Sequence, residues 1–132
     1  GEKLAPVLTV YKASDFADAK RIASSIYDYM GAGHSVGLHT TQTERAQDLG
    51  MTLPVSRVIV NQAHCFATGG NFDNGLPFSL SMGCGTWGGN SFSDNMNYRH
   101  YMNITRVVQT IVATEPQAET IFADYLEKFH RA

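Results

Sequence analysis

The fold is decided by residues 35–60, SVGLHTTQTERAQDLGMTLPVSRVIV. Residues 35–40 and 55–60 are rich in apolar and β-branched side chains, which is typical of strands. Between them, Thr41 is followed three residues later by Glu44. This capping-box signature predicts a short helix that closes at Gly50. Strand, helix and strand joined by short connections predict a parallel sheet.

The residues before this stretch extend it by one more strand and helix. Residues 7–11, VLTVY, have the composition of a strand that is covered on both faces. Ser14 is expected to cap a helix whose apolar residues recur at helical spacing as far as Met30, with Gly31 as a left-handed cap at its end. The predicted fold class is therefore α/β, a parallel sheet with flanking helices.

The regular pattern stops after Asn61. Residues 62–93 contain seven of the twelve glycines and a single charged side chain, Asp73. Long loops in compact domains are usually functional, and this one is too rich in aromatic residues for a disordered tail. We expect it to pack in part against polypeptide that is absent from this chain.

Regular structure is predicted again near the C-terminal end. Residues 106–113 are typical of a strand, and Thr114 with Gln117 repeats the capping-box logic for a last helix. Apolar residues from Ala118 to Phe129 would form one continuous stripe on that helix. Two roles stay open for this stripe. In the first, the stripe covers the chain's own sheet. In the second, residues 114–131 are a non-catalytic assembly or interaction module that docks in a partner's groove.

Composition excludes several classes of protein. The chain has 132 residues and a formal charge of −2, which gives no electrostatic basis for binding nucleic acid or an anionic membrane. It has no apolar run near the roughly 20 residues of a membrane span, and no apolar signal region follows Gly1. Two cysteines are too few for a disulfide framework. We expect a soluble cytoplasmic chain and, because a strand begins so close to Gly1, a piece of a longer protein.

Few motifs carry chemistry by themselves. Residues 83–88, GCGTWG, match the dinucleotide fingerprint G-x-G-x-x-G, but neither a helix nor a later acidic residue follows in the required place. Cys84 is a nucleophile or, more commonly for a free cysteine, a small apolar filler. His64 and Cys65 are adjacent, so they point to opposite faces of an extended chain. The histidines show no recognised ligand spacing, so no metal site is expected.

His34 has two open interpretations. It leads into the predicted strand at that strand's amino end, whereas ligands of parallel sheets collect at carboxyl ends. This placement disfavours a catalytic role and favours a histidine that is hydrogen-bonded to loop backbone. Arg57, Arg99 and Arg106 are expected to be solvated surface residues, outside any site.

Four segments together resemble a known family. They are residues 2–8 (EKLAPVL), 33–34 (GH), 57–61 (RVIVN) and 77–91 (PFSLSMGCGTWGGNS). In order and spacing they resemble the C-terminal part of the CoA-acylating aldehyde dehydrogenases, which include one half of the bifunctional aldehyde-alcohol dehydrogenases. Residues 71–106 look most like the acylating sulfoacetaldehyde dehydrogenases.

The resemblance implies an activity that this chain would share in. In the family, a cysteine attacks a small aldehyde, a hydride passes to NAD or NADP, and coenzyme A releases the product as acyl-CoA. The nucleophilic cysteine and the nucleotide-binding domain lie upstream of the matched residues, so the chain alone is expected to be inactive. Residues 1–105 would be the trailing part of the catalytic domain. Residues 106–132 would supply an oligomerisation strand and a C-terminal helix to a homo-oligomer, a dimer or tetramer.

The same resemblance assigns roles to individual positions. Glu2 would hold the nicotinamide ribose, because a carboxylate can accept hydrogen bonds from vicinal hydroxyls. Leu4 would pack beside the nicotinamide, and His34 would act near the coenzyme A step as the catalytic residue. Pro77, Phe78 and Cys84 would line the substrate pocket. Cys84 matches a second cysteine of the family and not the nucleophile.

Overall fold

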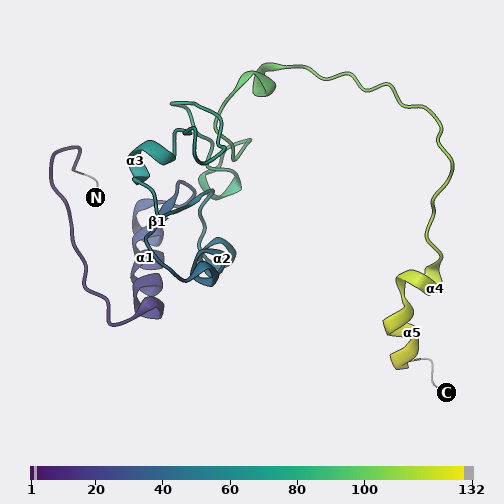
Figure 1. Cartoon of the computed structure of the whole chain (residues 1–132), viewed down its shortest axis with the longest axis horizontal. Coiled ribbons are helices and arrows are strands. Elements are labelled where there is room, and N and C mark those ends of the chain that lie inside the picture. Colours follow the sequence, from purple (N-terminus) through teal and green to yellow (C-terminus); the bar gives the residue numbers. More distant parts are fainter. Residues whose placement is uncertain (2, 130–132) are drawn as a thin grey trace. The chain divides into compact units, whose positions relative to one another are not determined.

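The structure is a computed structural model that describes residue 1 and residues 3–129. It divides into two units, Gly1–Met102 and Asn103–Ala132. In the first unit the helix α1 (Phe16–Met30) is followed by β1 (Val36–Leu38), α2 (Thr43–Thr52) and β2 (Val58–Val60). Figure 1 shows α1 and α2 beside the strands, with the loop-rich remainder of the unit beyond them.

The two strands are parallel, as the sequence predicts. Val36 lies opposite Val58, and Leu38 lies opposite Val60. An isolated parallel bridge between Gly33 and Val55 continues the pairing toward the amino ends of the strands. The α/β class is therefore confirmed, with α2 as the connection between neighbouring parallel strands.

Helix α1 is where the spacing of its apolar residues predicts it, but its cap differs. The N-cap is Asp15, whose side chain accepts a hydrogen bond from the Asp18 N–H at 2.8 Å. Ser14 instead donates its N–H to the Asp18 carboxylate at 3.1 Å, so Ser14 is not the cap. Gly31 ends the helix with a positive φ of 105°, although its ψ of 147° lies outside the left-handed helical region.

Helix α2 also begins later than predicted. Its N-cap is Gln42, which makes no side-chain cap bond, so the expected capping box of Thr41 and Glu44 is wrong. The Gln42 N–H is instead satisfied by the Thr40 Oγ1 at 3.1 Å. The helix continues past Gly50 to Thr52 and is followed by its C-cap Leu53, whose N–H donates to the Leu49 carbonyl at 2.9 Å.

The helices cover one face of the sheet. The buried centre of this core consists of Leu49, Leu53 and Val55. Side chains from α1 and from both strands pack around it: Phe16, Ala23, Tyr27, Val36, Leu38 and Val58. Alternation along a strand turns Arg57 and Ile59 to the opposite face.

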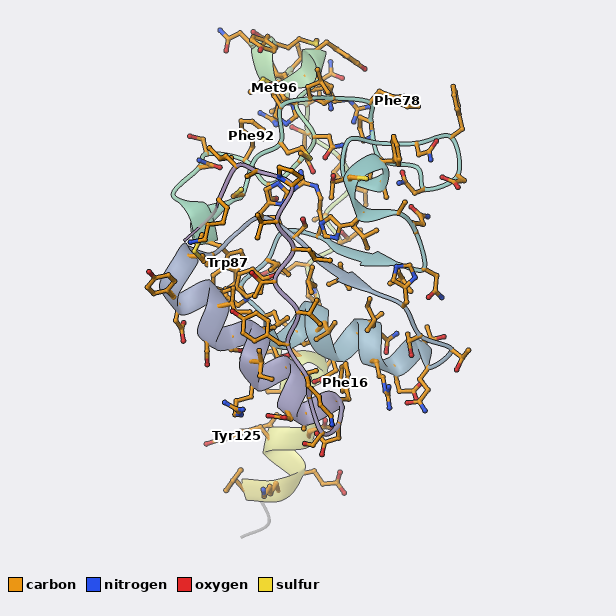
Figure 2. The ribbon with its side chains drawn as sticks, turned by 90° about the vertical axis from the view of Figure 1, so that its left-hand side faces the viewer. Phe16, Phe78, Trp87, Phe92, Met96 and Tyr125 are labelled. Atoms are coloured by element: carbon orange, nitrogen blue, oxygen red, sulfur yellow. The ribbon has the colours of Figure 1, made fainter. Side chains whose placement is uncertain are left out.

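The long segment after β2 covers that opposite face. It contains α3 (His64–Ala67), the short 3-10 helices η1 (Thr86–Gly88) and η2 (Tyr98–Tyr101), and an isolated bridge between Met82 and Asn95. Its contacts with β2 show that part of its packing partner lies within the chain. Several of its large apolar side chains are nevertheless exposed, among them Phe78 and Trp87, which Figure 2 labels.

Two predicted strands are not formed. Residues 7–11 and 106–113 are both without regular secondary structure, and their large apolar side chains are exposed. A strand is stable only when a neighbour satisfies its backbone hydrogen bonds. Within the described residues of each unit, no strand pairs with either segment, so the strand predicted at residues 7–11 is not formed there. The oligomerisation strand predicted at residues 106–113 is one that pairs with another subunit, and it stays a prediction.

The second unit ends in two short helices, α4 (Ala118–Ile121) and α5 (Ala123–Phe129). The N-cap of α4 is Gln117, so Thr114 is not the cap. The predicted single helix is interrupted at Phe122, where φ is −103° and ψ is 19°. Ile121, Phe122, Tyr125 and Phe129 are all exposed, so the apolar stripe is present but uncovered.

Candidate functional site

His34 lies in the turn that leads into β1. The preceding Gly33 donates its N–H to the Pro54 carbonyl at 2.8 Å and accepts from the Ser56 N–H at 3.2 Å. Its φ of +109° is a conformation that favours glycine. These bonds fix the backbone beside His34, whose side chain is exposed while its Nδ1 lies 2.5 Å from the Ser35 Oγ. The histidine is thus held by a neighbouring hydroxyl and not by loop backbone.

A second histidine approaches the same hydroxyl. His64, the first residue of α3, places its Nε2 2.7 Å from the Ser35 Oγ. Its ring lies over Gly37 in β1, where an added Cβ would come within 2.7 Å of the His64 Nδ1. Burial, and then the nearby His34 charge, lower the pKa of His64 below its usual 6.5. His64 is therefore held in its neutral form near neutral pH.

This lowered pKa predicts how stability depends on pH. A histidine that binds protons less well in the folded state stabilises the fold fully above about pH 6.5, and that contribution is lost as the pH falls below this value. We expect the melting temperature of the chain to fall on acidification below 6.5, and His64→Gln to flatten that part of the curve. Thermal unfolding by circular dichroism between pH 5 and 8 measures both, and an identical curve for His39→Gln and His64→Gln would contradict the assignment.

Cys84 lies beside the same turn. A Cβ added at Gly33 would come 2.8 Å from the Cys84 Cβ and 2.8 Å from the Gly88 nitrogen, so the loop packs against Gly33 backbone. The Cys84 N–H is held by the Asn90 Oδ1 at 2.8 Å, and Cys84 itself is half-buried. The structure therefore brings Cys84 and the His34 turn together, although they are far apart in the sequence.

A hollow adjoins this loop. It has a volume of about 450 Å³ and is lined by residues 85–87 and 90–93 together with Val55 and Ser56. The Ser56 Oγ is buried and has no hydrogen-bond partner in the described part of the chain. The volume is in the range of small-molecule sites, but Cys84 itself does not line the hollow.

Arg57 is the side chain that sequence reasoning misplaced. It is 7% exposed, so the expectation of a solvated surface arginine is wrong for this residue, whereas Arg99 and Arg106 are exposed. Its Nε donates to the Asn95 Oδ1 at 3.0 Å and one terminal nitrogen donates to the Gly83 carbonyl at 3.1 Å. Its other terminal nitrogen has no partner among the described residues.

Asn95 joins this arginine to the rest of the loop. It is 1% exposed, and its Nδ2 donates to the Thr68 carbonyl at 2.9 Å and to the Pro77 carbonyl at 2.8 Å. The Asn95 side chain thus ties Arg57, the residue before β2, to two other parts of the loop, the Thr68 and Pro77 carbonyls. Neither Arg57 nor Asn95 was a predicted site residue. The sequence did hold one indication of the pair, because Arg57 is a charged residue within a predicted buried strand.

The remaining predicted positions are less constrained. Phe78 is 60% exposed and meets Phe72 edge-on, with ring centroids 5.0 Å apart. Leu4 is 89% exposed, with a positive φ of 46°. Glu2 lies outside the described residues. The structure therefore brings Pro77 into the Asn95 network and Cys84 to the His34 turn, but it gives Leu4 no enclosing site.

The described residues do not form a dinucleotide cradle. The glycines at 83–88 lead only into η1, which has three residues, and not into a helix whose N–H groups could hold a pyrophosphate. Leu4 faces solvent, where it could not position a nicotinamide alone. NAD or NADP therefore does not fit on these residues by themselves. Within the described residues there is also no group of three or more potential metal ligands, and no helix long and apolar enough to cross a membrane.

Comparison with known proteins gives a consistent result. No protein-family model matches the sequence. The chain is 62% identical over 128 residues to a sulfoacetaldehyde dehydrogenase (acylating) of Cupriavidus necator, covering 97% of this chain and 26% of that protein. It spans 26–28% of the length of this relative and of two further sulfoacetaldehyde dehydrogenases that it matches.

Solved structures agree with this match. A probable aldehyde dehydrogenase of Listeria monocytogenes superposes with a TM-score of 0.76 at 32% identity, over 91% of this chain and 25% of that one. An acetylating aldehyde dehydrogenase of Geobacillus thermoglucosidasius gives 0.75 at 30% identity, over 88% and 25%. In sequence and in fold, the chain thus corresponds to about one quarter of an acylating aldehyde dehydrogenase.

Proposed function

We propose that the chain is part of an NAD(P)-dependent, CoA-acylating aldehyde dehydrogenase that converts a small aldehyde such as sulfoacetaldehyde to its acyl-CoA. The observation that carries this proposal is the 62% identity over 97% of the chain to a relative named for that substrate. The similarity in fold to an acetylating enzyme, over 88% of this chain, supports it. A cytoplasmic location suits the two unpaired cysteines.

His34 is proposed to act on coenzyme A, the second substrate. Its Nδ1 is engaged by Ser35, while its Nε2 has no partner among the described residues. The thiolate and not the thiol is the nucleophile. The coenzyme A sulfur would lose its proton to the His34 Nε2, and the resulting thiolate would attack the enzyme-bound thioester. Pro77, Phe78 and Cys84 would line the acyl pocket without forming a covalent bond.

The other parts of the reaction are proposed to depend on residues outside the described chain. The described residues hold no dinucleotide cradle, so Glu2 and Leu4 would contribute to a nicotinamide site only together with a separate nucleotide-binding domain. The nucleophilic cysteine would also lie elsewhere. In this proposal the chain itself contributes the lining of the acyl pocket and one general base, His34.

A second role, in assembly, is favoured by a separate observation. Residues 106–113 and the stripe from Ile121 to Phe129 expose their apolar side chains. A hollow of about 400 Å³ on α4 and α5 is lined almost entirely by carbon, from residues such as Phe122 and Tyr125. These segments would contact a second subunit in a homo-oligomer, through strand addition and helix packing.

A chimaera tests the enzymatic proposal. The 128 matched residues of the Cupriavidus necator enzyme are replaced by the corresponding residues of this chain, and acyl-CoA formation is followed with sulfoacetaldehyde, coenzyme A and NAD or NADP. We expect the chimaera to retain turnover within about tenfold of the parent. We expect the isolated chain to show none, because it lacks the nucleophile.

Each other outcome has a definite meaning. A chimaera that folds and assembles like the parent, but forms no acyl-CoA, would contradict the enzymatic role and leave the assembly role. Turnover by the isolated chain would contradict the proposed upstream nucleophile and would point to Cys84 or Cys65.

A further inference from the structure

A row of three side chains crosses from the start of β1 to α3. The His34 Nδ1 lies 2.5 Å from the Ser35 Oγ, and the same oxygen lies 2.7 Å from the His64 Nε2. A serine hydroxyl has one proton, so it can donate to only one of the two rings while it accepts from the other. The proton positions on the two histidines are therefore linked through Ser35.

The backbone holds this row in place. The Tyr27 hydroxyl of α1 donates to the Ser35 carbonyl at 2.9 Å, which fixes the serine at the edge of the core. On the other side, Gly37 leaves the space that the His64 ring occupies. The hydroxyl and the second ring are thus positioned by the helix on one face of the sheet and by the loop on the other.

No carboxylate takes part in the row. Among the described residues, neither ring pairs with Asp or Glu, and the electrostatic neighbour of His64 is His34 itself. Burial disfavours the charged form of His64, so one of its two ring nitrogens can accept a hydrogen bond. A neutral imidazole that accepts at Nε2 carries its proton on Nδ1.

We infer that Ser35 and His64 are positioning residues that hold His34 as the Nδ1–H tautomer. In this arrangement the His34 Nδ1–H donates to the Ser35 Oγ, and the Ser35 O–H donates to the His64 Nε2. The His34 Nε2 then keeps its lone pair free and directed away from the row. The inference rests on the proposed function in one respect: the coenzyme A thiol is the group that gives its proton to the His34 Nε2.

The arrangement also suits the protonated state. When the coenzyme A thiol gives its proton to the His34 Nε2, an N–H bond forms, the S–H bond breaks and the electron pair stays on sulfur. The positive imidazolium still donates from Nδ1 to Ser35, and this bond becomes charge-assisted. No donor or acceptor in the row has to turn, so the base is pre-organised. In the opposite arrangement Nε2 would carry a proton and could not act as a base.

Nitrogen chemical shifts of the histidine rings test the inference without any catalytic assay. A histidine free in water prefers the Nε2–H tautomer, so the row must reverse that preference. In the ¹⁵N-labelled chain at pH 8 we expect His34 to be mainly Nδ1–H, and we expect Ser35→Ala to return it to mainly Nε2–H. Ser25→Ala is the matched control, because the Ser25 hydroxyl donates to the Arg21 carbonyl of its own helix, away from the row. An Nε2–H tautomer of His34 in the unaltered chain would overturn the inference.

Kinetics of the chimaera give a second readout. Ser35→Ala and His64→Phe should each lower kcat about 10- to 100-fold with little change in KM for the aldehyde, the range seen when an orienting partner is lost. Ser35→Thr keeps the hydroxyl, and His64→Gln keeps an acceptor, so each should recover most of the rate. An equal loss in conservative and non-conservative variants would contradict a positioning role. If the unaltered chimaera is inactive, the proposed function fails while the nitrogen shifts still decide the inference.

Discussion

His34→Gln in the chimaeric enzyme is expected to slow acyl-CoA formation about 10²- to 10⁴-fold, the contribution of a positioned general base. The amide can still donate to Ser35 but cannot take a proton from coenzyme A. Formation of the bound thioester should be much less affected, since it precedes the attack by coenzyme A. A single-turnover burst of reduced nicotinamide, followed by slow steady-state release of acyl-CoA, is therefore the expected pattern.

The pH dependence separates a lost base from a general defect. An ordinary thiol ionises near pH 8.5, so thiolate becomes available without a base as the pH rises. The rate of His34→Gln should accordingly approach that of the unaltered chimaera toward pH 9. His39→Gln is the matched control, because His39 is also an exposed histidine close to β1. A loss smaller than threefold at pH 7, or an equal loss at every pH, would contradict the role proposed for His34.

Asn95→Ala is expected to be the most destabilising single substitution in the loop. It removes the acceptor of the Arg57 Nε and the donor to two carbonyl groups, and so leaves two buried groups, on Arg57 and Thr68, and the part-buried Pro77 carbonyl without these partners. Each unsatisfied buried group costs about 1–3 kcal/mol, so we expect a loss of about 3–5 kcal/mol in the free energy of unfolding. Such a loss is a large part of the stability of a small domain.

Denaturant unfolding of the chain, followed by circular dichroism, measures this effect. Asn103→Ala is the matched control, because Asn103 is an exposed asparagine outside the first unit. In addition, protease cleavage within residues 69–97 should become faster in Asn95→Ala, since the bonds that hold the loop to β2 are lost. A change below about 1 kcal/mol would show that the loop is held by contacts other than the Asn95 network.

The sequence predicts correctly those helices and strands whose position is determined by their own apolar pattern and by packing against nearby segments of the chain. Helix α1 and the pair β1 and β2 were correctly placed because their apolar periodicity is satisfied within the same unit. Residues 7–11 have the composition of a strand but no partner among the described residues of their unit, so composition alone was misleading there. Residues 106–113 were predicted to pair with another subunit, which this chain by itself does not test. Cap residues were misassigned at α1 and α2, where several oxygen-bearing side chains compete for the same N–H groups.

The sequence pointed to a residue of the candidate site only where one short motif carried the information. His34 could be found from its glycine-histidine turn, but Ser35 and His64 are 29 residues apart and Arg57 and Asn95 are 38 apart. Contacts of that separation depend on how the loop crosses the sheet, which no local pattern specifies. Two residues did carry a signal: Gly37 inside a strand, which indicates a close approach, and Arg57 among buried neighbours.

The space above Gly37 has a consequence for natural variation. The His64 ring occupies the volume that any side chain at position 37 would need, so the two positions share one volume between them. Evolution can enlarge one of them only by shrinking the other. Across divergent sequences, we expect larger residues at 37 to occur with small residues at 64, and the lineages that keep the glycine to be those that keep the histidine.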